Sequence, residues 1–146
     1  QKYDLPKAEE AINLTSAKAV IEAYQNGIRS FKNIVIENGS FFGENLEGII
    51  IEDSRIHADF RNANLKDAIL INGYVKMSDF RYTNLTNARF ENLNVELTKF
   101  KKATLDGFVF KNNSAFGNNN LQKTDFERLF LQPIPKGKYY LDDLKK

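Results

Sequence analysis

Residues 58–87 read ADFRN-ANLKD-AILIN-GYVKM-SDFRY-TNLTN, which are consecutive blocks of five residues. The third residue of every block is apolar, as in Phe60 and Leu65, and the first residue is small, as in Ala58 and Ala63. A helix repeats every 3.6 residues and a strand every two, so neither fits a sustained period of five. A short fixed period is typical of a repeat fold, in which each unit buries its apolar face against its neighbours.

The period of five extends on both sides of this stretch. One phase runs from Phe31 to Ile56, a four-residue step leads to Phe60, and a second phase continues to Phe110. A six-residue step then leads to Phe116, and we expect the chain to bulge or loop out at that step. The repeats are therefore predicted to continue through both interruptions.

Five of the blocks are close to the pattern Ala-(Asp/Asn)-Leu-X-X, through which the chain resembles the pentapeptide-repeat family. The resemblance extends from about residue 31 to about residue 126. It implies an all-β solenoid, a right-handed quadrilateral β-helix with four pentapeptides per coil. The first and third residues of each block would point inward, and the other three would face solvent. The closest blocks are residues 58–62, 63–67, 78–82, 83–87 and 103–107.

Four blocks per coil sort the apolar residues into four stacked columns, and nearly five coils are predicted. The outside of the first column is called the first face below, and the outside of the third column is called the third face. The predicted columns are Phe41, Phe60, Phe80, Phe100 and Leu121; Leu46, Leu65, Leu85, Leu105 and Phe126; Phe31, Ile51, Leu70, Phe90 and Phe110; and Ile36, Ile56, Val75, Val95 and Phe116.

Both ends of such a solenoid expose apolar core and unpaired strand edges, so both need a cover. Residues 1–30 are predicted to hold a capping helix at about 16–26, with Thr15 or Ser16 as its N-cap and Gly27 as its stop. Residues 31–126 would form the β-helix. Residues 127–146 are predicted to form a short helical C-terminal cap.

Composition bounds the class of protein. The 146 residues carry a net charge of +2, contain no cysteine and include no apolar run long enough to span a membrane. The chain begins at Gln1 and not at a methionine, so we expect that an upstream segment was removed. That segment could be a signal peptide or another domain, or the start could be only a cloning choice. The compartment stays open between the cytoplasm and export to a periplasm or thylakoid lumen.

Residue types that carry catalysis are scarce. His57 is the only histidine, and no nucleophile motif or glycine-rich phosphate loop is present in the sequence. We therefore predict no enzymatic activity, no catalytic residue, no metal site and no cofactor.

The third face is the first candidate for a binding site. A contiguous apolar patch on a surface suggests a partner, although β-branched residues also simply favour strands. Arg89 and Glu91 interrupt the patch, which leaves open whether it forms one piece or two. The candidate partner-binding residues are Ile50, Ile69, Ile71 and Val109, with Tyr74 around the next corner.

The first face carries a column of cations, Arg61, Arg81 and Lys101. The functional interpretation is a stripe that binds anions, and the alternative is an ordinary solvated surface. Asp59 and Asp79 lie two positions away and would offset the repulsion between the cations. Without interleaved aromatic residues or a basic tail, a nucleic-acid partner is not favoured.

The family resemblance brings in two kinds of function. Some members imitate DNA and bind DNA gyrase through a strongly negative surface, which the net charge of +2 and the basic column disfavour here. Most others resemble non-catalytic binding or scaffold modules. We expect a protein-interaction or scaffold module with an unidentified protein partner, as a monomer or homodimer. The alternative is a purely structural or spacer domain detached from a larger protein.

Overall fold

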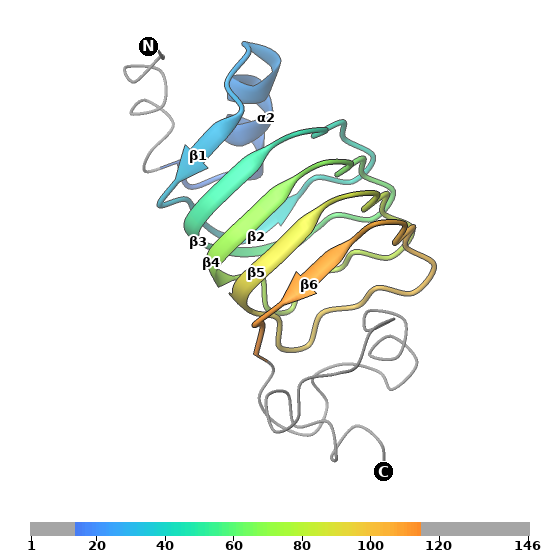
Figure 1. The fold of residues 1–146 in the computed structure, drawn as a ribbon. Coiled ribbons are helices and arrows are strands. Elements are labelled where there is room, and N and C mark those ends of the chain that lie inside the picture. Colours follow the sequence, from blue (N-terminus) through green and yellow to red (C-terminus); the bar gives the residue numbers. More distant parts are fainter. Residues whose placement is uncertain (1–13, 115–146) are drawn as a thin grey trace, which may run out of the picture.

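The computed structural model describes residues 14–114. It is a parallel β-solenoid of about four turns with one helix at its N-terminal end (Figure 1). The strands form one sheet in the order β1-β3-β4-β5-β6, and β2 pairs with a second part of β3. The elements are α2 (Ala17–Gln25), β1 (Ser30–Lys32), β2 (Val35–Ser40), β3 (Ile50–Asp59), β4 (Ile69–Tyr74), β5 (Arg89–Asn94) and β6 (Val109–Lys111).

The corners of the solenoid explain the period of five. The amide of Ala63 donates to the carbonyl of Phe60 at 3.1 Å, which closes a β-turn around Arg61 and Asn62. Asn62 has φ of 62°, the left-handed conformation that the third residue of a type II turn requires. Asparagine, aspartate and glycine tolerate this conformation best, and most corners carry one of them.

The four predicted columns are confirmed as the core. Phe41, Phe60, Phe80 and Phe100 are fully buried. Their rings stack with centroids 4.8, 4.8 and 5.2 Å apart, and Phe90 of the third column meets Phe80 edge to face at 5.2 Å. Each coil therefore buries its apolar side chains against those of the coils above and below.

The predicted N-terminal helix is confirmed as α2. Ser16 is the N-cap, and its hydroxyl accepts a hydrogen bond from the first turn at 3.1 Å. Gly27, with φ of 99°, follows the last turn. The Tyr24 hydroxyl donates to the Glu47 carbonyl at 2.7 Å, and one side of the helix is buried against the first coil.

The two irregular steps have different outcomes. The four-residue step is absorbed as a bulge, in which Glu37 and Asn38 of β2 lie opposite His57 of β3. At the six-residue step the chain keeps its register as far as Ser114, which pairs with Asn94 twenty residues earlier. The bulge expected at this step stays a prediction, because the step ends at Phe116, outside the described residues. Phe116, Leu121, Phe126 and residues 127–146 lie outside the described residues, so about four turns are observed where nearly five were predicted.

Asn113 explains why the chain stays regular before that step. It occupies an inward position that usually takes a small residue, and its side chain is buried. The amide group donates to the Phe90 carbonyl at 2.9 Å and accepts from the Leu93 amide at 2.9 Å. Because both of its hydrogen-bonding groups find backbone partners, a polar side chain fits inside the coil.

Candidate functional site

The third face brings three of the predicted binding residues together. Ile50 of β3 pairs with Ile69 of β4, and Ile71 lies between Glu52 of β3 and Glu91 of β5. The three isoleucines are half-buried, because neighbouring side chains on adjacent strands cover one another. They form one small apolar patch with glutamates on two sides.

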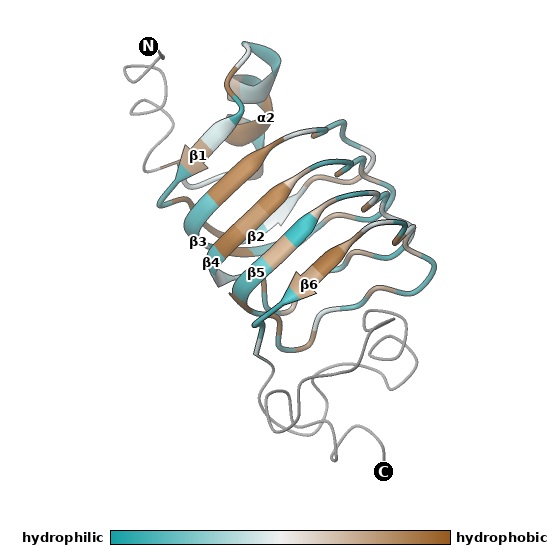
Figure 2. Cartoon of the chain, viewed as in Figure 1, coloured by the Kyte–Doolittle hydropathy of each residue, from teal (hydrophilic) through white to brown (hydrophobic). Residues whose placement is uncertain are grey.

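The other two predicted residues lie apart from this patch. Val109 of β6 is separated from Ile69 by Arg89, whose guanidinium bonds Glu91 at 2.5 Å. Figure 2 shows this interruption, since the brown of β3 and β4 gives way to teal on β5 before brown returns on β6. Tyr74 lies around the next corner as expected, under the ammonium group of Lys76 at 4.8 Å.

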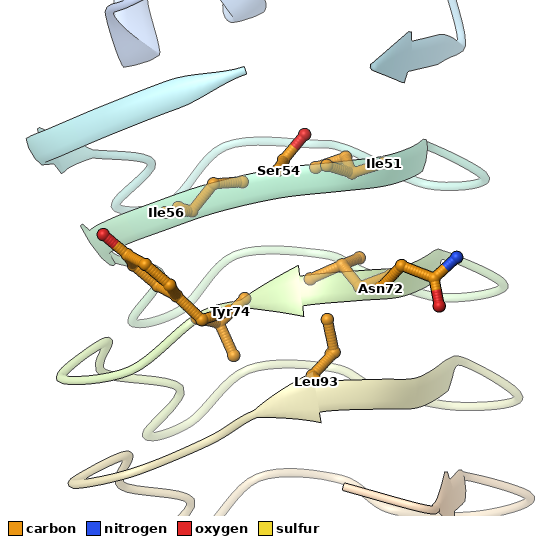
Figure 3. A pocket seen from close by; sticks show the side chains of 8 residues that line it. Ile51, Ser54, Ile56, Asn72, Tyr74 and Leu93 are labelled. Atoms are coloured by element: carbon orange, nitrogen blue, oxygen red, sulfur yellow. The ribbon is translucent and has the colours of Figure 1, made fainter. Parts of the chain in front are cut away.

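A small pocket opens at the corner beside Tyr74. Ser54 of β3, Asn72 and Tyr74 of β4, and Leu93 of β5 contribute to its lining (Figure 3). The cavity holds about 10 Å³, which is about the space of one water molecule. A volume of this size takes no organic substrate, so the corner is part of the packing.

Ion pairs occupy much of the predicted anion stripe on the first face. The Arg61 guanidinium donates to both carboxylate oxygens of Asp59 at 2.9 and 3.0 Å. Arg81 binds Asp79 in the same way, at 2.6 to 3.0 Å. The offset predicted for the two aspartates is therefore confirmed. Lys101, in the next coil, is exposed.

These ion pairs shift the pKa of both carboxyl groups. Hydrogen bonding by Arg61 lowers the pKa of Asp59 below its usual value. At Asp79 partial burial alone would raise the pKa, but the hydrogen bonds and charge of Arg81, together with the charge of Lys99, lower it overall. The pKa values of Arg61 and Arg81 rise correspondingly.

We expect these pairs to make stability depend on pH at the acidic end. A lowered native pKa adds stability above the ordinary aspartate pKa of about 3.9, and this stability disappears as pH falls through the native pKa. The double variant Asp59→Asn/Asp79→Asn should therefore melt a few degrees below wild type at neutral pH. This difference should vanish in strong acid when melting is followed by circular dichroism.

The control for that experiment is Glu22→Gln/Glu37→Gln, which removes two exposed carboxylates elsewhere. Its melting temperature should stay close to that of wild type at neutral pH, because surface charges outside such pairs contribute little. A deficit of the aspartate variant that persists unchanged in strong acid would contradict the assignment.

Sequence reasoning missed the most exposed large apolar residues. Tyr82 is 54% exposed, Phe42 50%, Met77 46% and Leu97 42%. The residues predicted on the third face are all less exposed than these four. Phe42 lies on the first face, and the other three occupy its two corners. The signal was available, because an apolar residue at the fifth position of a block occupies a corner that usually carries Asn, Asp or Gly.

Residues 14–114 lack two further features. No group of three or more histidine, aspartate or glutamate side chains in this part lies close enough to hold a metal ion. Within the same range no helix has the length and apolarity needed to cross a membrane.

Comparison with known proteins identifies the repeat. The family model described as pentapeptide repeats matches residues 58–94 in eight copies. No curated protein matches the sequence.

Two similar solved structures are both of QnrB1, described as a plasmid-mediated fluoroquinolone resistance protein. The full-length form has a TM-score of 0.57 at 19% identity, over 59% of this chain and 48% of that one. A trypsin-treated variant has a TM-score of 0.59 at 20% identity, over 77% of this chain and 59% of the other. The chain thus spans less than two thirds of either structure, and the likeness concerns the fold.

Proposed function

We propose that this pentapeptide-repeat chain is a non-catalytic protein-interaction or scaffold module that binds a partner protein through its third face. The observation that carries the proposal is the placement of Ile50, Ile69 and Ile71 on adjacent paired strands, with Glu52 and Glu91 at the edge of the patch. An apolar centre with a charged rim is the usual composition of a protein interface. Val109, beyond Arg89, and Tyr74, around the next corner, would add separate contacts with the same partner.

The solenoid supports this role through its rigidity. Backbone hydrogen bonds between β3, β4 and β5 fix the strands that carry the patch, and Leu70 and Phe90 beneath it are buried. A surface that is already ordered loses little conformational entropy when it binds. A small apolar patch can therefore contribute usefully to affinity.

The double variant Ile69→Lys/Ile71→Lys is expected to weaken partner binding by about tenfold or more, as for residues at the centre of an interface. The fold should survive, because both side chains point outward and a lysine at position 71 would lie between Glu52 and Glu91. The measurement is affinity capture from the source organism's lysate, followed by titration of the captured protein.

The matched control is Val35→Lys/Thr104→Lys, which adds the same charge at exposed positions on other faces. Equal capture by wild type and both variants would remove the site from the third face. Failure of wild type to capture any protein would instead favour the spacer role. Recovery of DNA gyrase would favour the DNA-mimicking function.

A further inference from the structure

Backbone conformation singles out four residues around the first face. Among residues 14–114, twelve residues other than glycine have positive φ, and eight of these are asparagine or aspartate. The four others are Met77, Tyr82, Leu97 and Lys102, with φ between 59° and 63°. A large side chain is unfavourable in this conformation, and such residues gather at functional sites.

All four lie at the corners that border one part of the first face. Met77 and Leu97 stand twenty residues apart at the corner where the chain enters this face, and Tyr82 and Lys102 stand twenty apart where it leaves. Adjacent coils are joined there, since the Tyr82 amide donates to the Lys101 carbonyl at 3.1 Å. We name these four residues the corner frame.

The surface inside the corner frame carries an excess of positive charge. Asp79 pairs with Arg81 in one coil, and the next coil places Lys99 opposite Asp79 and Lys101 beyond it. With Lys102, the frame and its interior hold one carboxylate and four cations. Within the described range no ion pair involves Lys99, Lys101 or Lys102, and all three are exposed.

We propose that the corner frame is a docking surface for an acidic segment of a partner protein. Lys99, Lys101 and Lys102 would bind carboxylates of that segment. Met77, Leu97 and Tyr82 would pack against its apolar side chains. Methionine, tyrosine and arginine are enriched in protein interfaces. Three exposed apolar side chains beside the lysines favour a protein over duplex DNA, whose binding is dominated by its charged phosphates. The proposal does not rest on the third face.

The charge complementarity can be tested with a fluorescent peptide of alternating glutamate and leucine. Wild type is expected to bind it, and Lys99→Gln/Lys101→Gln/Lys102→Gln should weaken binding by about tenfold, as several charged contacts are lost. Fluorescence anisotropy at low salt measures both. Ile69→Lys/Ile71→Lys should bind the peptide at least as well as wild type, which separates this surface from the third face.

A matched control separates local contacts from net charge. Three lysines outside the corner frame are replaced, which changes the net charge by the same amount. Binding should stay within about twofold of wild type, because distant charges are screened. Equal losses in both triple variants would overturn the proposal. The control substitutions are Lys18→Gln, Lys32→Gln and Lys66→Gln.

The three apolar residues of the corner frame allow a second test, which measures peptide binding and melting temperature together. If these side chains served only to stabilise the fold, their replacement would lower the melting temperature. Met77→Asn/Tyr82→Asn/Leu97→Asn installs the residue that is commonest at the other corners of the described chain. Peptide binding should fall while the melting temperature stays the same or rises, since asparagine suits positive φ better. A lower melting temperature would mean that these side chains stabilise the fold, and would overturn the proposal.

Three further outcomes would also overturn it. If the wild-type protein fails to bind the peptide, the corner frame is not a docking surface for an acidic segment. Tighter binding of duplex DNA than of the peptide, lost in the lysine variant, would assign the surface to nucleic acid. Self-association of wild type that disappears in the asparagine variant, seen by sedimentation velocity, would assign it to a second copy of this chain.

Discussion

Phe80→Ala is expected to lower the free energy of unfolding by about 3–5 kcal/mol, the usual cost of emptying a buried phenylalanine site. Phe80 is fully buried and lies between the stacked rings of Phe60 and Phe100, with the edge of Phe90 at its side. The coils are fixed by backbone hydrogen bonds above and below, so the cavity has little means of closing. The whole transition should shift in a chemical denaturation experiment.

The neighbouring Arg81→Ala is the control for this prediction. Arg81 points outward and pairs with Asp79 on a partly exposed surface, so its loss should cost less than about 1 kcal/mol. Similar losses for Phe80→Ala and Arg81→Ala would contradict the assignment of inward and outward positions.

The inward positions were predictable because the period of five marks the apolar and small positions, and the family resemblance implies that these positions point inward. Phe60, Phe80 and Phe100 repeat every twenty residues, and the structure stacks their rings in one column. This prediction needed no information on distant contacts, since each repeat packs on the equivalent repeat of the next coil. The helix cap followed from equally local signals at Ser16 and Gly27.

The surface was less predictable, because exposure depends on neighbours in adjacent coils. Ile50 and Ile69 occupy outward positions, yet each covers part of the other. Leu97 is more exposed, because a corner projects beyond the strands. Asn113 shows that positions inside the solenoid also depend on adjacent coils. Its inward side-chain amide is tolerated because it donates a hydrogen bond to the carbonyl of Phe90.

Gly73→Ala is expected to cost about 3 kcal/mol or more, through backbone strain together with overpacking. Gly73 has φ of 125°, which strains any residue with a side chain. A Cβ at this position would overlap the carbonyl oxygen of Ser54 and approach the Ser54 nitrogen to 2.8 Å. These backbone atoms belong to the paired strand β3, so they cannot move without breaking the ladder.

Gly48→Ala separates the two causes. Gly48 also has positive φ, at 74°, but an added Cβ there meets no atom within 4 Å. Its cost should be about 1 kcal/mol, from the backbone conformation alone. Equal losses in denaturant unfolding would show that close approach of the coils at Gly73 contributes nothing. The larger loss expected at Gly73 would explain why this block begins with glycine where the two preceding blocks begin with Ala63 and Ala68. At that corner the coil below carries the large side chain of Leu93, and the coil above leaves no room for a Cβ.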